Sequence, residues 1–183
     1  MSTKYKFHNP DGLYFVTYTV VGWVDVFTRT IYRNILIDSF NYCTKEKGLV
    51  IYAWVIMTNH VHMIIARNGL ISLEDIMRDM KKFTSVKIVH AIENSNKESR
   101  KKWMINIFKA YGKANSNNTK FQFWQQNNHP IELTANKIIE QKLKYLHENP
   151  VVHGFSNSAE CYHWSSAIDY AGGKGLVDIN LLD

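Results

Sequence analysis

The stretch that decides the fold runs from Leu49 to Ala66 and reads LVIYAWVIMTNHVHMIIA. Two apolar runs, rich in β-branched and aromatic residues, flank a short polar break at Thr58 and Asn59. Such runs favour strands, and Asn tolerates the positive φ that a narrow hairpin turn needs. The stretch therefore predicts two antiparallel strands joined by a tight turn.

The second of these strands carries two histidines on one face. Side chains alternate along a strand, so His60, His62 and Ile64 share one side. Two imidazoles at this spacing can hold one divalent metal ion, which would offset the cost of burying polar rings among apolar residues. Two half-buried histidines that hydrogen-bond to neighbouring strands give the same pattern, so the spacing alone leaves both interpretations open.

Length and composition indicate one globular domain. The chain has 183 residues, of which 45% are hydrophobic and 13% aromatic, so we expect residues 1–183 to fold around one core. Cys43 and Cys161 lack metal-like spacing and favour a reduced, cytoplasmic setting. The sequence shows no signal-peptide pattern and no apolar run of membrane-spanning length, so we expect no membrane partner.

The positive charge is concentrated in one part of the chain. Residues 78–120 contain eleven Lys or Arg and three acidic residues, a formal charge of +8, whereas the rest of the chain carries −2. A localised basic surface is what a polyanion such as nucleic acid requires. A solvated helical face with surplus lysines has the same composition, so charge alone does not identify a function.

Periodicity and capping residues predict the remaining elements. They are a strand at 13–23, a helix at 31–47 ended by Gly48, a helix from Leu73 to about Ile92 capped by Ser72, a short helix at 98–113 that buries Trp103, an extended pair within 121–133, and a helix from Ala135 to about Glu148 stopped by Pro150. This order predicts an α+β fold with the split βαβ antiparallel sheet of ferredoxin-like proteins. Two helices would cover one face of the sheet and leave the other face free for a site. We expect three additions to this fold: an insertion at about 94–120, an extra C-terminal helix, and a tail at about 150–183.

The last predicted helix carries a candidate nucleophile. A metal-bound histidine pair beside a basic surface suggests phosphodiester chemistry, which needs an attacking group. At about 100° per residue, Tyr145 lies about 120° from the core direction set by Ile139, and Asn149 lies about 40° from Tyr145. The phenol and the amide can therefore project together from the rim of the buried face. A tyrosine that only packs against the core would occupy the same position.

Four segments together resemble one family. They are Asn59-His60-Val61-His62 at the hairpin, Phe123-Trp124 before a strand, Tyr145-Leu146-His147-Glu148-Asn149-Pro150-Val151 at a helix end, and Tyr162-His163-Trp164-Ser165-Ser166 in the tail. The combination is similar to that of REP-associated tyrosine transposases, a group of single-tyrosine transposases with a histidine–hydrophobe–histidine metal site. The similarity covers about residues 10 to 170.

The resemblance implies a single-stranded DNA endonuclease and strand transferase that acts near DNA hairpins. His60 and His62 would bind Mg²⁺ or Mn²⁺, with Asn149 as the third ligand. Tyr145 would attack the scissile phosphate, form a 5′-phosphotyrosine and free a 3′-hydroxyl. Some relatives pass the tyrosine helix to a partner subunit, so a homodimer is possible.

Side chains that would contact the DNA come from two helices. Arg78, Lys81 and Lys82 can follow the DNA backbone, and Lys142 flanks the tyrosine. Phe121, Phe123 or Trp124 could stack on a base, although core packing is the more common role of such aromatics.

Two other functions fit the same residues. A non-catalytic ferredoxin-like module could bind structured nucleic acid while His60 and His62 remain structural. A metal-dependent phosphodiesterase could use water as its nucleophile, with further ligands from His129, His147 or His153.

Overall fold

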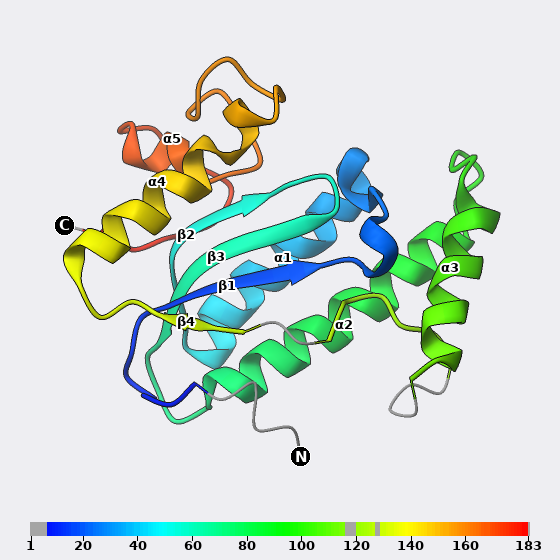
Figure 1. The fold of residues 1–183 in the computed structure, drawn as a ribbon, viewed down its shortest axis with the longest axis horizontal. Coiled ribbons are helices and arrows are strands. Elements are labelled where there is room, and N and C mark those ends of the chain that lie inside the picture. Colours follow the sequence, from blue (N-terminus) through cyan, green and yellow to red (C-terminus); the bar gives the residue numbers. More distant parts are fainter. Residues whose placement is uncertain (1–6, 116–119, 127–128, 183) are drawn as a thin grey trace.

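Four antiparallel strands form one sheet in the computed structural model, which describes residues 7–115, 120–126 and 129–182. The strands are β1 (Tyr14–Thr19), β2 (Leu49–Ile56), β3 (His60–Arg67) and β4 (Ile131–Glu132), in the order β2-β3-β1-β4 (Figure 1). All three pairings are antiparallel, and β3 lies between β1 and β2 as the split βαβ pattern requires. The predicted α+β fold is confirmed.

The β2–β3 hairpin forms where the sequence placed it. Ile56 pairs with Val61, and the Met57 amide donates to the His60 carbonyl at 2.8 Å. The expected backbone role of Asn59 is wrong, because Trp23 is the only non-glycine residue with positive φ in the described part of the chain. Asn59 instead uses its side chain, which bonds to His60 and Asp25.

Two helices cover one face of the sheet. They are α1 (Thr30–Lys47) and α2 (Leu73–Glu93), which lie behind the strands in Figure 1. The predicted C-terminal end of α1 and N-terminal end of α2 are confirmed. Gly48 ends α1 at φ 72°, and the Ser72 side chain caps α2 by accepting a hydrogen bond from the Asp75 amide. Val16, Met63 and the rest of the larger core cluster fill the space between these helices and the sheet.

The opposite face carries the two histidines, and we call it the site face. α4 (Asn136–Val152) packs on its β2 and β3 strands, so this face is partly covered rather than free (Figure 1). A second core cluster, which includes Phe15, Ile64 and Leu146, fills the contact. The tail continues from α4 along the edge of β2, where Ser165 bridges Val55, and then forms the short helix α5 (Ala167–Tyr170).

Several predicted boundaries are wrong. β1 ends at Thr19 and continues into two 3₁₀ turns, η2 (Val21–Trp23) and η3 (Val26–Thr28). In the described part of 121–133, which leaves out 127–128, the expected extended pair is reduced to the two residues of β4 and one bridge between Val20 and Trp124. α4 runs through Pro150 to Val152, because a proline in the last turn removes only one backbone donor.

The predicted insertion contributes one helix, α3 (Lys101–Lys113), in its described part. α3 packs against α2 and η2 and lies at the far side of the molecule from α4 (Figure 1). Trp103, expected in the core, is 52% exposed, whereas Phe108 is buried. No helix in the described ranges is both long and apolar enough to span a membrane.

Candidate metal centre and tyrosine

His60 and His62 lie side by side on the site face. Their ring centroids are 4.7 Å apart, as expected for residues two apart on one strand. Burial lowers the pKa of His60 to about 4, with a smaller contribution from His153. Burial also lowers the pKa of His62 to about 3, helped by the nearby charges of His60 and Lys142. Both imidazoles are therefore neutral at pH 7 and can offer a lone pair to a metal ion.

His62 is held by the neighbouring strand β1. Thr17, its register partner, places its hydroxyl oxygen 2.8 Å from His62 Nδ1, and the Phe15 ring stacks at 5.2 Å. The other ring nitrogen, Nε2, is buried and has no hydrogen-bond partner within the described residues. A buried nitrogen without a hydrogen-bond partner lowers the stability of the folded protein, and a bound ligand at Nε2 would offset that cost.

α4 brings Tyr145 to the histidines of the same chain. The Tyr145 ring centroid lies 5.3 Å from that of His62 and 6.1 Å from that of Phe15. Tyr145 remains 49% exposed, so its phenol is accessible from solvent. Lys142, one turn earlier, places its ammonium 5.6 Å from the Tyr145 ring centroid and 4.9 Å from that of Phe15. The phenol ring thus stands beside the His62 imidazole and a positive charge.

Asn149 lies one turn beyond Tyr145 and is 4% exposed. Its Oδ1 is a second buried polar atom that lacks a hydrogen-bond partner in the described part of the chain. His153 Nδ1 donates to the Asn149 backbone carbonyl at 2.9 Å, and His153 is close enough to lower the pKa of both His60 and His62. The end of α4 therefore lies beside the histidine pair.

The donor atoms fit a divalent cation. An imidazole nitrogen and an amide oxygen, both buried and both unpaired among the described residues, are ligand types that Mn²⁺ and related ions accept. No three His, Cys, Asp or Glu side chains converge on a metal-sized site anywhere in the ranges the structure describes. A centre at this place thus depends on the Asn149 amide in addition to His60 and His62.

The tail fixes α4 against the sheet. His147 Nε2 lies 2.9 Å from the Ser166 hydroxyl, which also accepts from the Trp54 amide at 2.9 Å. Burial lowers the pKa of His147 to about 4, so this ring is neutral at pH 7. The Tyr162 hydroxyl donates to the Ile56 carbonyl at 2.9 Å. These bonds join α4, the tail and β2 into one unit that positions Tyr145.

The other predicted DNA contacts are not brought to the site. Arg78, Lys81 and Lys82 all lie on α2, which covers the opposite face of the sheet. Arg78 pairs with Asp75 and Asp79. Lys81 donates to the Gln125 carbonyl at 3.2 Å, and burial lowers its pKa to about 8. Of the four predicted contacts, Lys142 is the one beside Tyr145, and a role for the others in DNA binding stays a prediction.

Sequence reasoning did not identify the supporting roles of three residues near the site. Thr17 and Ser166 hold His62 and α4 through hydrogen bonds across the sheet and tail, and Asp25 reaches the hairpin through Asn59. Their partners are distant in sequence, and only the register of β1 against β3 could have identified Thr17. Phe123 and Trp124 are buried in the core, so they do not face the histidines.

Part of the chain matches a family model that describes transposases, the class of protein that the sequence motifs resemble. Residues 23–106, which include the histidine hairpin, match the family model for IS200-like transposases. The resemblance to these transposases is confirmed. The match supports a transposase-type enzyme that acts on DNA and cleaves it.

A solved structure has the same fold. It is that of a REP-associated tyrosine transposase bound to a REP hairpin, with a TM-score of 0.61 and 19% sequence identity. The similarity covers 100% of this chain and 94% of that chain. At this identity the comparison establishes the fold alone. No protein of curated function matches the sequence.

Proposed function

We propose that the chain is a metal-dependent single-stranded DNA endonuclease and strand transferase that uses Tyr145 as its nucleophile. The observation that carries this proposal is a half-exposed phenol beside His62, one of two neighbouring neutral histidines. Two buried ligand atoms, His62 Nε2 and Asn149 Oδ1, have no partner among the described residues. A residue that served packing alone would not require unpaired polar atoms around it.

His60, His62 and Asn149 are the proposed ligands of a divalent ion. When bound, such an ion acts as a Lewis acid that polarises the scissile phosphate and orients it for in-line attack. Two imidazoles favour Mn²⁺ over the harder Mg²⁺, although both ions accept an amide oxygen. The low pKa values of the histidines keep them available as ligands over the whole physiological pH range.

Tyr145 carries the covalent step in this proposal. Its phenol oxygen attacks the phosphorus and gives up its proton to solvent, the bond from phosphorus to the 3′-oxygen breaks, and the leaving oxygen takes up a proton from solvent as a 3′-hydroxyl. The DNA then remains attached through a 5′-phosphotyrosine, and attack by another 3′-hydroxyl reverses the step. Lys142 places a positive charge beside the phenol, where it would attract the incoming phosphate. Because Tyr145 contacts His62 of its own chain, we propose action in cis.

Single-stranded DNA that carries a hairpin is the proposed substrate. The family match supports DNA as the partner, and the solved relative is bound to a REP hairpin. A charge of +8 within residues 78–120 supplies a surface for the phosphate backbone. That surface includes α2 and α3, away from α4, so contacts there would hold flanking DNA rather than the scissile bond.

Covalent capture of DNA tests the proposal. Incubated with Mn²⁺ and a hairpin-bearing single strand, the protein should form an adduct that survives denaturing electrophoresis. We expect Tyr145→Phe to abolish the adduct, because the nucleophilic oxygen is lost, whereas Tyr42→Phe, at a tyrosine 58% exposed on α1, should form it normally. An adduct that persists in Tyr145→Phe would mean that another residue attacks. Strand cleavage without any adduct would favour a hydrolase that uses water.

A further inference from the structure

The hydrogen bonds around Asn59 form a directed chain that ends on His60. Asn59 Oδ1 lies 2.7 Å from His60 Nδ1. On the other side of the amide, Asn59 Nδ2 donates to Asp25 Oδ1 at 3.0 Å and to the Trp23 carbonyl at 3.4 Å. All three partners belong to the β2–β3 turn and to the η2–η3 segment that packs beside it.

The two acceptors fix the orientation of the amide. A carboxylate and a backbone carbonyl can only accept hydrogen bonds, so the side of Asn59 that faces Asp25 and Trp23 must be its NH₂ group. The amide oxygen therefore faces His60. Because that oxygen can only accept, the proton must lie on His60 Nδ1, which leaves the lone pair on Nε2.

From this geometry we infer that Asp25 and Asn59 are positioning residues that hold His60 in the tautomer able to bind metal through Nε2. The inference rests on the proposed metal centre and adds residues that lie outside its ligand set. In metal sites, a partner on the second ring nitrogen fixes the ring and commonly changes metal affinity by about 10- to 100-fold.

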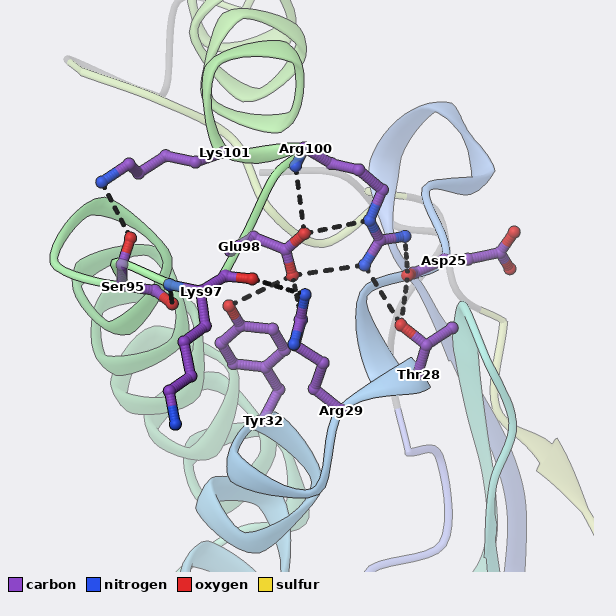
Figure 2. Close-up of polar contacts among 9 residues, drawn as sticks. All are labelled: Asp25, Thr28, Arg29, Tyr32, Ser95, Lys97, Glu98, Arg100 and Lys101. Atoms are coloured by element: carbon purple, nitrogen blue, oxygen red, sulfur yellow. Dashed lines mark hydrogen bonds and ion pairs between the residues drawn. The ribbon is translucent and has the colours of Figure 1, made fainter.

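Residues just before α3 hold the Asp25 end of this hydrogen-bond chain in place. Arg100 donates to the Asp25 carbonyl at 2.9 Å and to the Thr28 hydroxyl at 3.1 Å, and it also binds the buried Glu98 carboxylate (Figure 2). Arg29 binds the same carboxylate at 2.7 Å (Figure 2). The turn that carries Asp25 is thereby tied to the residues that precede α3. Trp23 adds a constraint of its own, since its φ of 53° is unfavourable for a bulky residue.

Tautomer and metal affinity can be measured without any DNA. Nitrogen NMR of the histidine side chains in the metal-free protein should show His60 protonated at Nδ1. In Asn59→Leu, which removes the acceptor, we expect a mixture of tautomers and Mn²⁺ affinity about 10- to 100-fold weaker. Asp25→Ala should act in the same direction with a smaller effect, because the Trp23 carbonyl still holds one NH₂ hydrogen. Asp11→Ala, on an exposed loop carboxylate, should leave both measurements unchanged.

A conservative variant separates orientation from charge. Asp25→Asn keeps an acceptor oxygen at the same position, so the tautomer and the Mn²⁺ affinity should be retained. If Asp25→Asn loses as much affinity as Asp25→Ala, the carboxylate acts by its charge and the inference is overturned. If Mn²⁺ affinity is unchanged in Asn59→Leu but lost in His60→Ala, the positioning role of Asn59 and Asp25 is overturned and the proposed metal centre stands. Unchanged affinity in His60→Ala would instead reject the proposed metal centre.

Discussion

At the scale of single residues, the site is marked by polar atoms that the fold leaves unpaired. Asn149 Oδ1 and His62 Nε2 are buried without partners among the described residues, which in most proteins costs about 1–3 kcal/mol for each such group. The protein therefore gives up stability at the positions where the proposed function needs ligands. A trade of stability for function of this kind is common at binding sites.

The trade can be measured at Asn149. Asn149→Leu replaces the unpaired amide with an apolar side chain of similar shape, so we expect the free energy of unfolding to rise by about 1 kcal/mol while Mn²⁺-dependent cleavage is lost. Urea denaturation and the adduct assay report the two effects. The matched control is Asn41→Leu, which removes a hydrogen bond to the Leu176 carbonyl and should lower stability. Reduced stability in Asn149→Leu would show that the amide has a favourable partner in the folded protein.

At the scale of elements, the tail decides where α4 lies. Ser166 is fully buried and joins three elements: it accepts from the Trp54 amide on β2, contacts His147 on α4, and precedes α5. The position of Tyr145 relative to His62 thus depends on residues about twenty positions later in the chain. The motif Tyr162–Ser166, identified from the sequence only by resemblance, has this structural role.

Removal of the Ser166 hydroxyl should loosen that junction. In Ser166→Ala the buried Trp54 amide loses its acceptor, so we expect a loss of about 1–3 kcal/mol in the free energy of unfolding. The rate of adduct formation should also fall, because α4 loses its bond through His147. Ser85→Ala, where the hydroxyl bonds only within α2 near the surface, should change neither value appreciably. A Ser166→Ala protein of unchanged stability and rate would show that apolar packing alone positions α4.

At the scale of the whole molecule, a buried ion cluster links the segment that precedes α3 to the start of α1. Burial alone would raise the Glu98 pKa, but hydrogen bonds from the Arg100 side chain and amide and from Arg29 outweigh it and lower the pKa to about 2. Because the folded pKa lies below the ordinary value, Glu98 stabilises the protein above about pH 4.5. This contribution is lost as the pH falls toward 2.

The pH dependence of stability tests this link. At pH 7 we expect Glu98→Gln to lower the free energy of unfolding by about 2 kcal/mol, a value reduced by solvent around the partly exposed arginines. The difference from the natural protein should shrink as the pH falls below 4. Urea titrations at a series of pH values measure it, with Glu46→Gln as an exposed control. A difference that stays constant from pH 7 to pH 3 would contradict the ionised cluster.

The central hairpin, the strand order and the face that carries the histidines could all be predicted from the amino-acid sequence. Alternation along β3 separates His60 and His62 from Met63 without reference to the rest of the chain, and Gly48 and Ser72 act through their immediate neighbours. These features are set by local backbone chemistry and side-chain period, which a sequence shows directly.

Contacts between distant side chains could not be predicted in this way, because they depend on how the elements pack. Periodicity placed Trp103 in the core and Pro150 at a helix end, but long-range packing exposes the first and includes the second within α4. The approach of Tyr145 to His62, and the bond from Asp25 to Asn59, join residues far apart in the chain. Such contacts follow from how α4 and the η2–η3 segment pack against the sheet, because packing depends on the summed burial of many side chains rather than on any local pattern.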